Sequence, residues 1–179
     1  MSDTFLPGSG FDTYEQQDKV LVGLCGGTGC KAAVRILQQQ GFAVMGAVVR
    51  LCTDDPVVDA AKEAAKALGI ECITLNASEL ASQLAEETAA PADLRFPALL
   101  AAADRLGIQY IATGHHARVE LGSDGVHTVC PAVDAVLDES AALAALPQDT
   151  LARLLLPLGE FTAADVQEMA QDFKVNGTV

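Results

Sequence analysis

Residues 19–40, KVLVGLCGGTGCKAAVRILQQQ, decide the fold. The uninterrupted apolar run at residues 20–24 predicts a central parallel strand, because such a run is typical of a strand that helices cover on both faces. The glycines within residues 26–29 predict a tight turn, and the apolar spacing of residues 32–37 predicts a helix that Gly41 ends. A strand, a glycine-rich turn and a helix N-terminus outline a phosphate site, because the free N–H groups of the first helical turn point at an anion.

The composition favours one compact domain. The chain has 179 residues, of which 50% are apolar and 20% charged, and we expect a domain at residues 19–179 after a mobile leader at residues 1–18. No apolar run reaches the length of a membrane span and no signal pattern opens the chain, so a cytoplasmic protein without a membrane contact is expected. Five scattered cysteines then predict reduced thiols.

The charge argues against a nucleic-acid partner. Only 11 Lys and Arg residues stand against 24 Asp and Glu residues, and the net charge is -13. Affinity for RNA depends largely on clustered cations that replace the counterions of the phosphates. Binding of tRNA without a partner protein is therefore not expected.

Alternating apolar segments and turn signals predict a doubly wound α/β fold with a parallel sheet. Further strands are expected at residues 43–51, 70–75 and 109–113, with a small β-hairpin at residues 117–121 and 126–130. Helices are expected at residues 56–68, 78–106 with a break near Pro91, 138–146, 148–155 and after Thr162.

The helix at residues 56–68 has clear boundary signals. Asp55 is expected to cap it, Pro56 to occupy its first position and Gly69 to end it. Its expected buried face consists of Val57, Ala61, Ala64 and Leu68.

The carboxyl ends of the strands define the expected ligand site. In doubly wound sheets ligands bind at this edge, where the strand order reverses. Residues 25–31, 50–53 and 114–116 follow the first, second and fourth strands. The glycines of the first and last of these segments are therefore expected to line one cleft.

Six motifs resemble one known family. They are CGGTGCK at residues 25–31, CTDDPVVDA at 52–60, RFPALL at 95–100, ATGHHAR at 112–118, VDAVLDESAAL at 133–143 and LARLLLPLGEFT at 151–162. Together they are similar to the N-terminal, PP-loop ATP pyrophosphatase domain of the bacterial tRNA-specific 2-thiouridylases. The resemblance implies a five-stranded parallel sheet of the adenine nucleotide α-hydrolase type that binds an adenine nucleotide, ATP or AMP. The candidate nucleotide-binding residues are Cys25, Gly26, Gly27, Thr28, Gly29, Cys30, Lys31, Val49, Gly114 and His115.

The turn departs from the family's SGGVDSS pattern. Cys25, Cys30 and Lys31 stand where the family has serines, and Gly29 stands where it has an aspartate. A thiol is a weak hydrogen-bond donor and glycine has no carboxylate. Nucleotide binding with little dependence on Mg²⁺ is therefore expected, and no metal ligand is assigned.

The sulfur-transfer residues of the family have no counterpart in this chain. The family's nucleophilic cysteine aligns with Ala90, and its second cysteine and its tRNA-holding β-barrel domains would follow Val179. Leu137 and Glu139 replace a lysine and a glutamine. The resemblance thus implies a truncated, degenerate homologue, a pseudoenzyme that does not thiolate tRNA by itself, and no catalytic residue is assigned.

Two groups of residues near the turn are open to two interpretations. Lys31 either reaches a phosphate or is a solvated lysine, and residues 115–116 are histidines that either contact a ligand or serve the structure. Cys25, Cys30 and Cys52 follow neighbouring strands. They either bind a metal, form a redox pair or pack in place of serines.

Two other functional classes are open. One is a non-catalytic interaction or regulatory protein, acting as a homodimer or as the partner of an intact sulfurtransferase. The other is a small-molecule enzyme with altered chemistry at Lys31 or at the cysteines. Thermal shifts with nucleotides, with and without Mg²⁺, distinguish these classes, because a bound ligand raises apparent stability.

Overall fold

The computed structural model describes residues 19–50, 54–77 and 95–176. The described residues do not include the expected leader at residues 1–18, Cys52, or the predicted helical segment at residues 78–94 with its break near Pro91. No helix in the described part of the chain is long and apolar enough to cross a membrane.

A parallel sheet forms the centre of the described chain, as predicted. Its five strands are ordered β3-β2-β1-β4-β7. They are β3 (Cys72–Asn76), β2 (Ala43–Arg50), β1 (Lys19–Gly23), β4 (Tyr110–Ala112) and β7 (Leu154–Leu155). The order runs outward from β1 in both directions, so the switch point of the sheet lies between β1 and β4.

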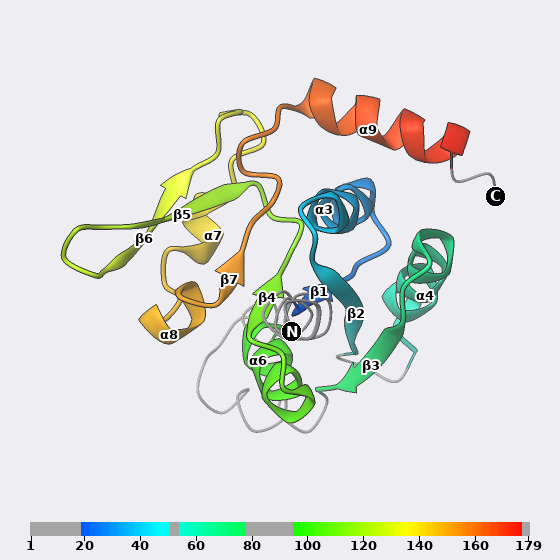
Figure 1. Cartoon of the computed structure of the whole chain (residues 1–179), viewed down its shortest axis with the longest axis horizontal. Helices are drawn as coiled ribbons and strands as arrows, with labels where there is room; N and C mark the ends of the chain where they lie inside the picture. Colours follow the sequence, from blue (N-terminus) through cyan, green and yellow to red (C-terminus); the bar gives the residue numbers. More distant parts are fainter. Residues whose placement is uncertain (1–18, 51–53, 78–94, 177–179) are drawn as a thin grey trace, which may run out of the picture.

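Helices cover both faces of the sheet, which confirms the doubly wound α/β class (Figure 1). α3 (Thr28–Gln39) and α4 (Pro56–Leu68) pack on one face, and α6 (Arg95–Leu106) packs on the other. The apolar run within β1 is buried on both faces of the sheet. Val20 and Val22 belong to the core under α3 and α4, Leu21 belongs to the core under α6, and all three are 0% exposed.

The boundaries of α4 follow its sequence signals. The Asp55 carboxylate accepts a hydrogen bond from the Val57 N–H at 3.1 Å, Pro56 is the first helical residue, and Gly69 ends the helix at φ 71°. The predicted face missed two buried residues, Val58 and Ala65, whereas Val57 is only partly buried and lines the pocket described below.

The prediction of a helix over residues 148–155 is wrong beyond its first turn. α8 (Gln148–Leu151) ends early, and Leu154–Leu155 pair with Ile111–Ala112 as the edge strand β7. The Ile111 N–H donates to the Arg153 carbonyl at 3.0 Å. A short apolar run fits a helix or a buried strand equally well, and here pairing with an open strand edge decides between them.

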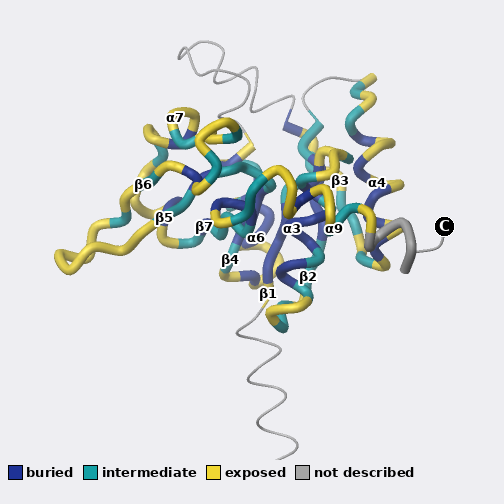
Figure 2. Tube along the Cα trace, turned by 90° about the horizontal axis from the view of Figure 1, so that it is seen from above, coloured by how far each residue is buried: buried dark blue, intermediate teal, exposed yellow. Residues whose placement is uncertain are grey.

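The remaining elements lie beside the sheet. β5 (Ala117–Leu121) and β6 (His127–Pro131) form the predicted hairpin, whose tip is exposed (Figure 2). α7 (Ser140–Leu143), shorter than the predicted helix, contacts β6. α9 (Ala163–Asn176) lies over α3 (Figure 1). Thr162 caps α9 as predicted, because its hydroxyl accepts from the Asp165 N–H while its own N–H donates to the Asp165 carboxylate.

Candidate functional site

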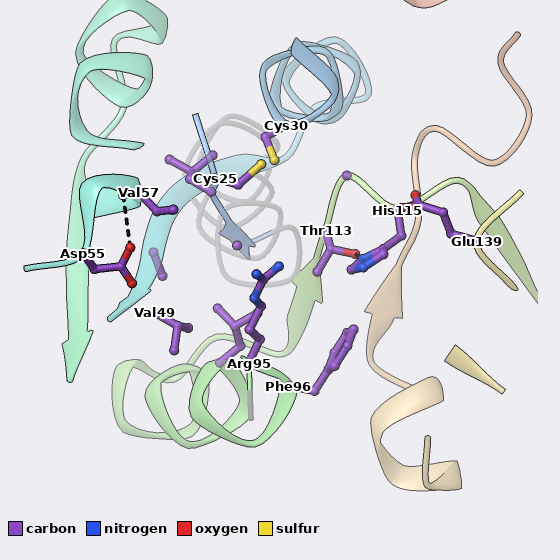
Figure 3. Close-up of a pocket in the computed structure, with 15 residues that line it drawn as sticks. Cys25, Cys30, Val49, Asp55, Val57, Arg95, Phe96, Thr113, His115 and Glu139 are labelled. Carbon is purple, nitrogen blue, oxygen red and sulfur yellow. Dashed lines mark hydrogen bonds between the residues drawn. The ribbon is translucent and has the colours of Figure 1, made fainter. Parts of the chain in front are cut away.

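A pocket of about 200 Å³ opens at the carboxyl edge of the sheet, beside the switch point between β1 and β4 (Figure 3). Its walls come from the ends of β1, β2 and β4, the starts of α3, α4 and α6, and the segment before α7. This is the position expected for a ligand site in a doubly wound sheet.

The glycine turn forms the boundary of the pocket on the side of α3. Gly27 is the N-cap of α3 and provides no side-chain hydrogen bond, and the first turn holds no acidic residue. The free N–H groups of the first turn of α3 are therefore open to an anion. Gly26 has φ +81°, and an added Cβ would lie 2.6 Å from the Ala60 Cβ, so this glycine serves the turn and its packing on α4.

The end of β4 lies directly against the start of α3. A Cβ on Gly114 would lie 3.1 Å from the Cys30 nitrogen, and a Cβ on Gly29 would lie 3.6 Å from the Gly114 carbonyl oxygen and 3.3 Å from the Leu158 Cδ1. The structure thus brings Gly114 to the same sheet edge as the glycine turn. Gly29 is enclosed by Leu158 and Gly114.

An apolar wall and one cation face the turn across the pocket. Val49, Val57 and Leu99 contribute apolar surface. The guanidinium of Arg95, at the start of α6, points into the pocket toward Cys25 (Figure 3). No described carboxylate forms an ion pair with Arg95, and its charge acts on Cys25 and His115.

His115 lines the pocket and contacts two neighbouring side chains. Its Nδ1 lies 2.8 Å from the Thr113 Oγ1, and its ring stacks on Phe96 at 5.9 Å between centroids. Burial lowers the pKa of His115, and the positive charge of Arg95 lowers it further, while Glu139 opposes the shift. The imidazole is therefore mainly neutral at pH 7.

The carboxylates of the pocket are already engaged with backbone groups. Glu139 accepts a hydrogen bond from the His116 N–H at 2.8 Å, and Asp55 caps α4. His116 is not part of the pocket lining, and its Nδ1 is buried without a hydrogen-bond partner among the described residues. No group of three or more His, Cys, Asp or Glu side chains in the described part of the chain could hold a metal ion.

Cys25 and Cys30 form a pair of thiols at the mouth of the pocket. Their sulfurs point toward one another, Cys25 exposed and Cys30 5% exposed (Figure 3). A hydrogen bond from the Cys30 thiol, assisted by the Gly27 N–H and the charge of Arg95, lowers the pKa of Cys25 to about 6. The same hydrogen bond and burial raise the pKa of Cys30.

Half of the ten predicted site residues line the pocket. They are Cys25, Cys30, Val49, Gly114 and His115. The other five, Gly26, Gly27, Thr28, Gly29 and Lys31, form the turn and the first turn of α3 beside it. The Lys31 backbone N–H bonds to the Gly27 carbonyl at 3.3 Å, and its side chain is outside the lining.

Sequence reasoning gave no site role to Arg95, Phe96, Thr113 or Glu139. All four line the pocket, and all four lie within or beside the family motifs at residues 95–100, 112–118 and 133–143. The motifs thus carried a signal, although only the tertiary structure shows that these side chains converge.

Comparison with known proteins identifies a family and relatives that this chain resembles. The profile of the family described as "tRNA methyl transferase HUP domain" matches residues 88–178. The tRNA-specific 2-thiouridylase MnmA of Carboxydothermus hydrogenoformans is 33% identical over 187 residues, covering 88% of this chain and 51% of that protein. The corresponding protein of Moorella thermoacetica is 34% identical over 179 residues, covering 84% of this chain and 50% of that protein. The chain therefore spans about half the length of these curated relatives.

Solved structures share the fold at low identity. The NH3-dependent NAD synthetase of Campylobacter jejuni has a TM-score of 0.54 at 12% identity, covering 91% of this chain and 69% of that chain. The glutamine-dependent NAD+ synthetase of Acinetobacter baumannii, solved with adenosine diphosphate, also has a TM-score of 0.54, at 15% identity, covering 90% of this chain and 30% of that chain. These similarities support the α/β architecture described above.

Proposed function

Because the chain belongs to the tRNA methyl transferase HUP-domain family, together with the tRNA-specific 2-thiouridylases, we propose that it binds an adenine nucleotide, ATP or AMP, in the pocket beside β1 and β4. The observation that carries the proposal is the contact of Gly114 with the first turn of α3 beside an uncapped helix N-terminus. Gly114 meets the backbone of Gly29 and Cys30 there, and the N–H groups of residues 28–30, in the first turn of α3, are proposed to bind a phosphate.

The rest of the pocket suits the other parts of a nucleotide. Val49, Val57 and Leu99 offer the apolar surface that an adenine ring requires. Arg95 pairs with no carboxylate among the described residues, and a guanidinium can bind a phosphate through two N–H groups at once. The ligand thus lies between Arg95 and the glycine turn, with its base toward β2.

Binding is proposed to depend little on Mg²⁺. Gly29 supplies no carboxylate, and a side chain there would meet Leu158. Asp55 and Glu139, the carboxylates of the pocket lining, each accept a backbone hydrogen bond. The described residues therefore do not fit a tightly held magnesium ion, which takes carboxylate oxygens in octahedral geometry.

The chain is proposed not to thiolate tRNA without a partner protein. The position of the family's nucleophilic cysteine is Ala90, which lies outside the described residues, and a methyl group carries no sulfur. The net charge of -13 further opposes binding to tRNA phosphates. In this proposal the chain retains nucleotide binding and has lost sulfur transfer.

Calorimetric titration with ATP and AMP tests the nucleotide proposal. Each nucleotide is titrated in Mg²⁺ and again in chelator, with GTP as a control for the base. We expect saturable binding of the adenine nucleotides whose Kd changes little when Mg²⁺ is removed. No binding in either buffer would refute nucleotide binding, and a strict Mg²⁺ requirement would refute the metal-independent mode.

A thiolation assay tests the second part of the proposal. The protein is incubated with tRNA, ATP and sulfide, and the product is examined on a mercury-containing gel, with an intact 2-thiouridylase as the positive control. We expect no retarded tRNA band above the enzyme-free sample. A retarded band would show that this chain transfers sulfur by residues other than those of the family.

A further inference from the structure

Two cysteines face each other across the glycine turn, with four residues between them in the sequence. The Cys25 sulfur lies over the N-cap of α3, 3.5 Å from the position of a Cβ on Gly27, and the Cys30 sulfur projects toward it from the first turn of the helix (Figure 3). Both are free thiols. We propose that Cys25 and Cys30 form a reversible disulfide that makes the phosphate-binding turn a redox-modification site for small-molecule disulfides.

The positions of the two thiols assign them different roles. Cys25 is exposed at the mouth of the pocket, where a dissolved disulfide can reach it, whereas Cys30 is buried. Arg95, the Gly27 N–H and the Cys30 thiol all stabilise a thiolate at Cys25, since each presents positive charge or a hydrogen-bond donor. An accessible, stabilised thiolate beside a second thiol is the arrangement found at redox-sensing cysteines. Cys25 is therefore the attacking thiol and Cys30 the resolving thiol.

The first step forms a mixed disulfide. The Cys25 thiolate attacks one sulfur of glutathione disulfide, a bond forms between Cys25 and that sulfur, and the S–S bond of the reagent breaks. One glutathione leaves as a thiolate and takes up a proton from water. The Cys25 sulfur is then neutral, and it is a weaker hydrogen-bond acceptor than the thiolate was.

The second step closes the protein disulfide. The hydrogen bond to Cys25 and the charge of that thiolate both raise the pKa of Cys30, and both disappear in the mixed disulfide. Cys30 then loses its proton to water and attacks the Cys25 sulfur, and the second glutathione leaves as a thiolate. In balance, one protein thiolate and one protein thiol lose two electrons and one proton, and one glutathione disulfide becomes one glutathione thiol and one glutathione thiolate.

Peptide mapping after incubation with glutathione and glutathione disulfide tests the proposal. Remaining thiols are blocked with iodoacetamide, and the protein is digested and analysed by mass spectrometry. We expect a peptide that contains both cysteines, lacks both alkyl groups and is lighter by two hydrogen atoms than its reduced form. Addition of a dithiol should restore alkylation at both sites. Alkylation of both cysteines in oxidising buffer, or pairing of Cys25 with another cysteine, would overturn the proposal.

Variants separate the two roles. Cys30→Ser should accumulate glutathione on Cys25, because the resolving thiol is gone, while Cys25→Ser should lose nearly all modification of Cys30. Cys130→Ser, in the β-hairpin away from the pocket, is the matched control and should form the Cys25–Cys30 disulfide as the wild type does. Equal glutathionylation of Cys30 in Cys25→Ser would contradict the assigned order.

A protection experiment connects this site with the pocket, and it rests on the proposed nucleotide binding. A phosphate on the turn blocks access to Cys25, so ATP at ten times its Kd should slow mixed-disulfide formation about tenfold by mass action. Bound ATP without protection would place the nucleotide away from Cys25 and overturn the connection. The disulfide itself is scored without nucleotide, so a failure of nucleotide binding is distinguishable from a failure of the redox proposal.

Discussion

Gly114 packs against the backbone nitrogen of Cys30, and a Cβ on this glycine would lie 3.1 Å from that nitrogen. The contact joins the end of β4 to the first turn of α3 and so fixes one wall of the pocket. Neither backbone segment can move aside as a flexible side chain would. The shape of the pocket therefore depends on the absence of a side chain at position 114.

Gly114→Ala should destabilise the protein by about 1–3 kcal/mol, because the added methyl group overpacks two backbone segments. Gly23→Ala is the matched control. A Cβ on Gly23 also meets its nearest neighbour at 3.1 Å, but that neighbour is the Leu99 Cδ1, the end of a side chain that can shift. Chemical denaturation should show the larger loss for Gly114→Ala, and an equal loss for Gly23→Ala would contradict the rigid contact.

Cys25 should react with iodoacetamide as a thiolate at unusually low pH. Because its pKa is lowered to about 6 and the thiolate is the form above the pKa, the rate should rise through about pH 6 and level off near pH 7. Replacing the strongest donor with Cys30→Ala should move this midpoint upward. A rate that rises only through about pH 8.5, the range of an ordinary thiol, would contradict the hydrogen-bonded pair.

His115 should titrate below the ordinary imidazole pKa of about 6.5, because burial disfavours its charged form. The unfolded chain binds this proton more readily, so the contribution of His115 to the free energy of unfolding is present above pH 6.5 and is lost as pH falls through the folded pKa. NMR of the imidazole protons measures the shift. Phe96→Ala should raise the pKa by exposing the ring, whereas Glu139→Gln should lower it further.

If Phe96→Ala and Glu139→Gln shifted the pKa of His115 in the same direction, the environment described for this residue would be wrong. The opposite signs follow from separate causes, because Phe96 excludes water from the ring and Glu139 supplies the negative charge that opposes the shift. Both variants are measured by the same titration, so each serves as the control for the other.

Arg95→Gln should weaken ATP binding about tenfold or more, since a hydrogen bond to a charged group contributes about 1.5–3 kcal/mol. The affinity for adenosine, which has no phosphate, should fall much less. Arg105→Gln is the matched control, because Arg105 is exposed on the same helix outside the pocket lining. Equal losses for ATP and adenosine, measured by calorimetry, would exclude a phosphate contact of Arg95.

The local elements were predictable where one physical signal dominates. The buried β1, the glycine turn and α3 follow from residues 19–40, and Asp55, Pro56 and Gly69 determine the ends of α4. β7 was not predictable from its own residues, because Leu154–Leu155 is too short to show a period and its structure depends on the edge of β4.

The position of the candidate site could be predicted from the sequence, but many of the side chains that line it could not. Parallel strands bring their carboxyl ends together, so the position of the Gly114 segment beside the turn followed from topology. The convergence of Arg95 and Glu139 depends on how α6 and the segment before α7 pack, which sequence periodicity does not encode. Gly26 fits the predicted turn, but its contact with Ala60 on α4 comes from tertiary packing.

Backbone amide NMR spectra, recorded while AMP is titrated into the protein, locate the bound nucleotide. We expect saturable shifts at the amides of Thr28, Gly29, Cys30 and Gly114, with the amides of the β5–β6 hairpin tip unchanged. The shifts are expected there because these amides would contact the phosphate of a nucleotide bound between α3 and β4. Saturable shifts that leave them unchanged, or an absence of any shift at excess AMP, would contradict nucleotide binding at this site.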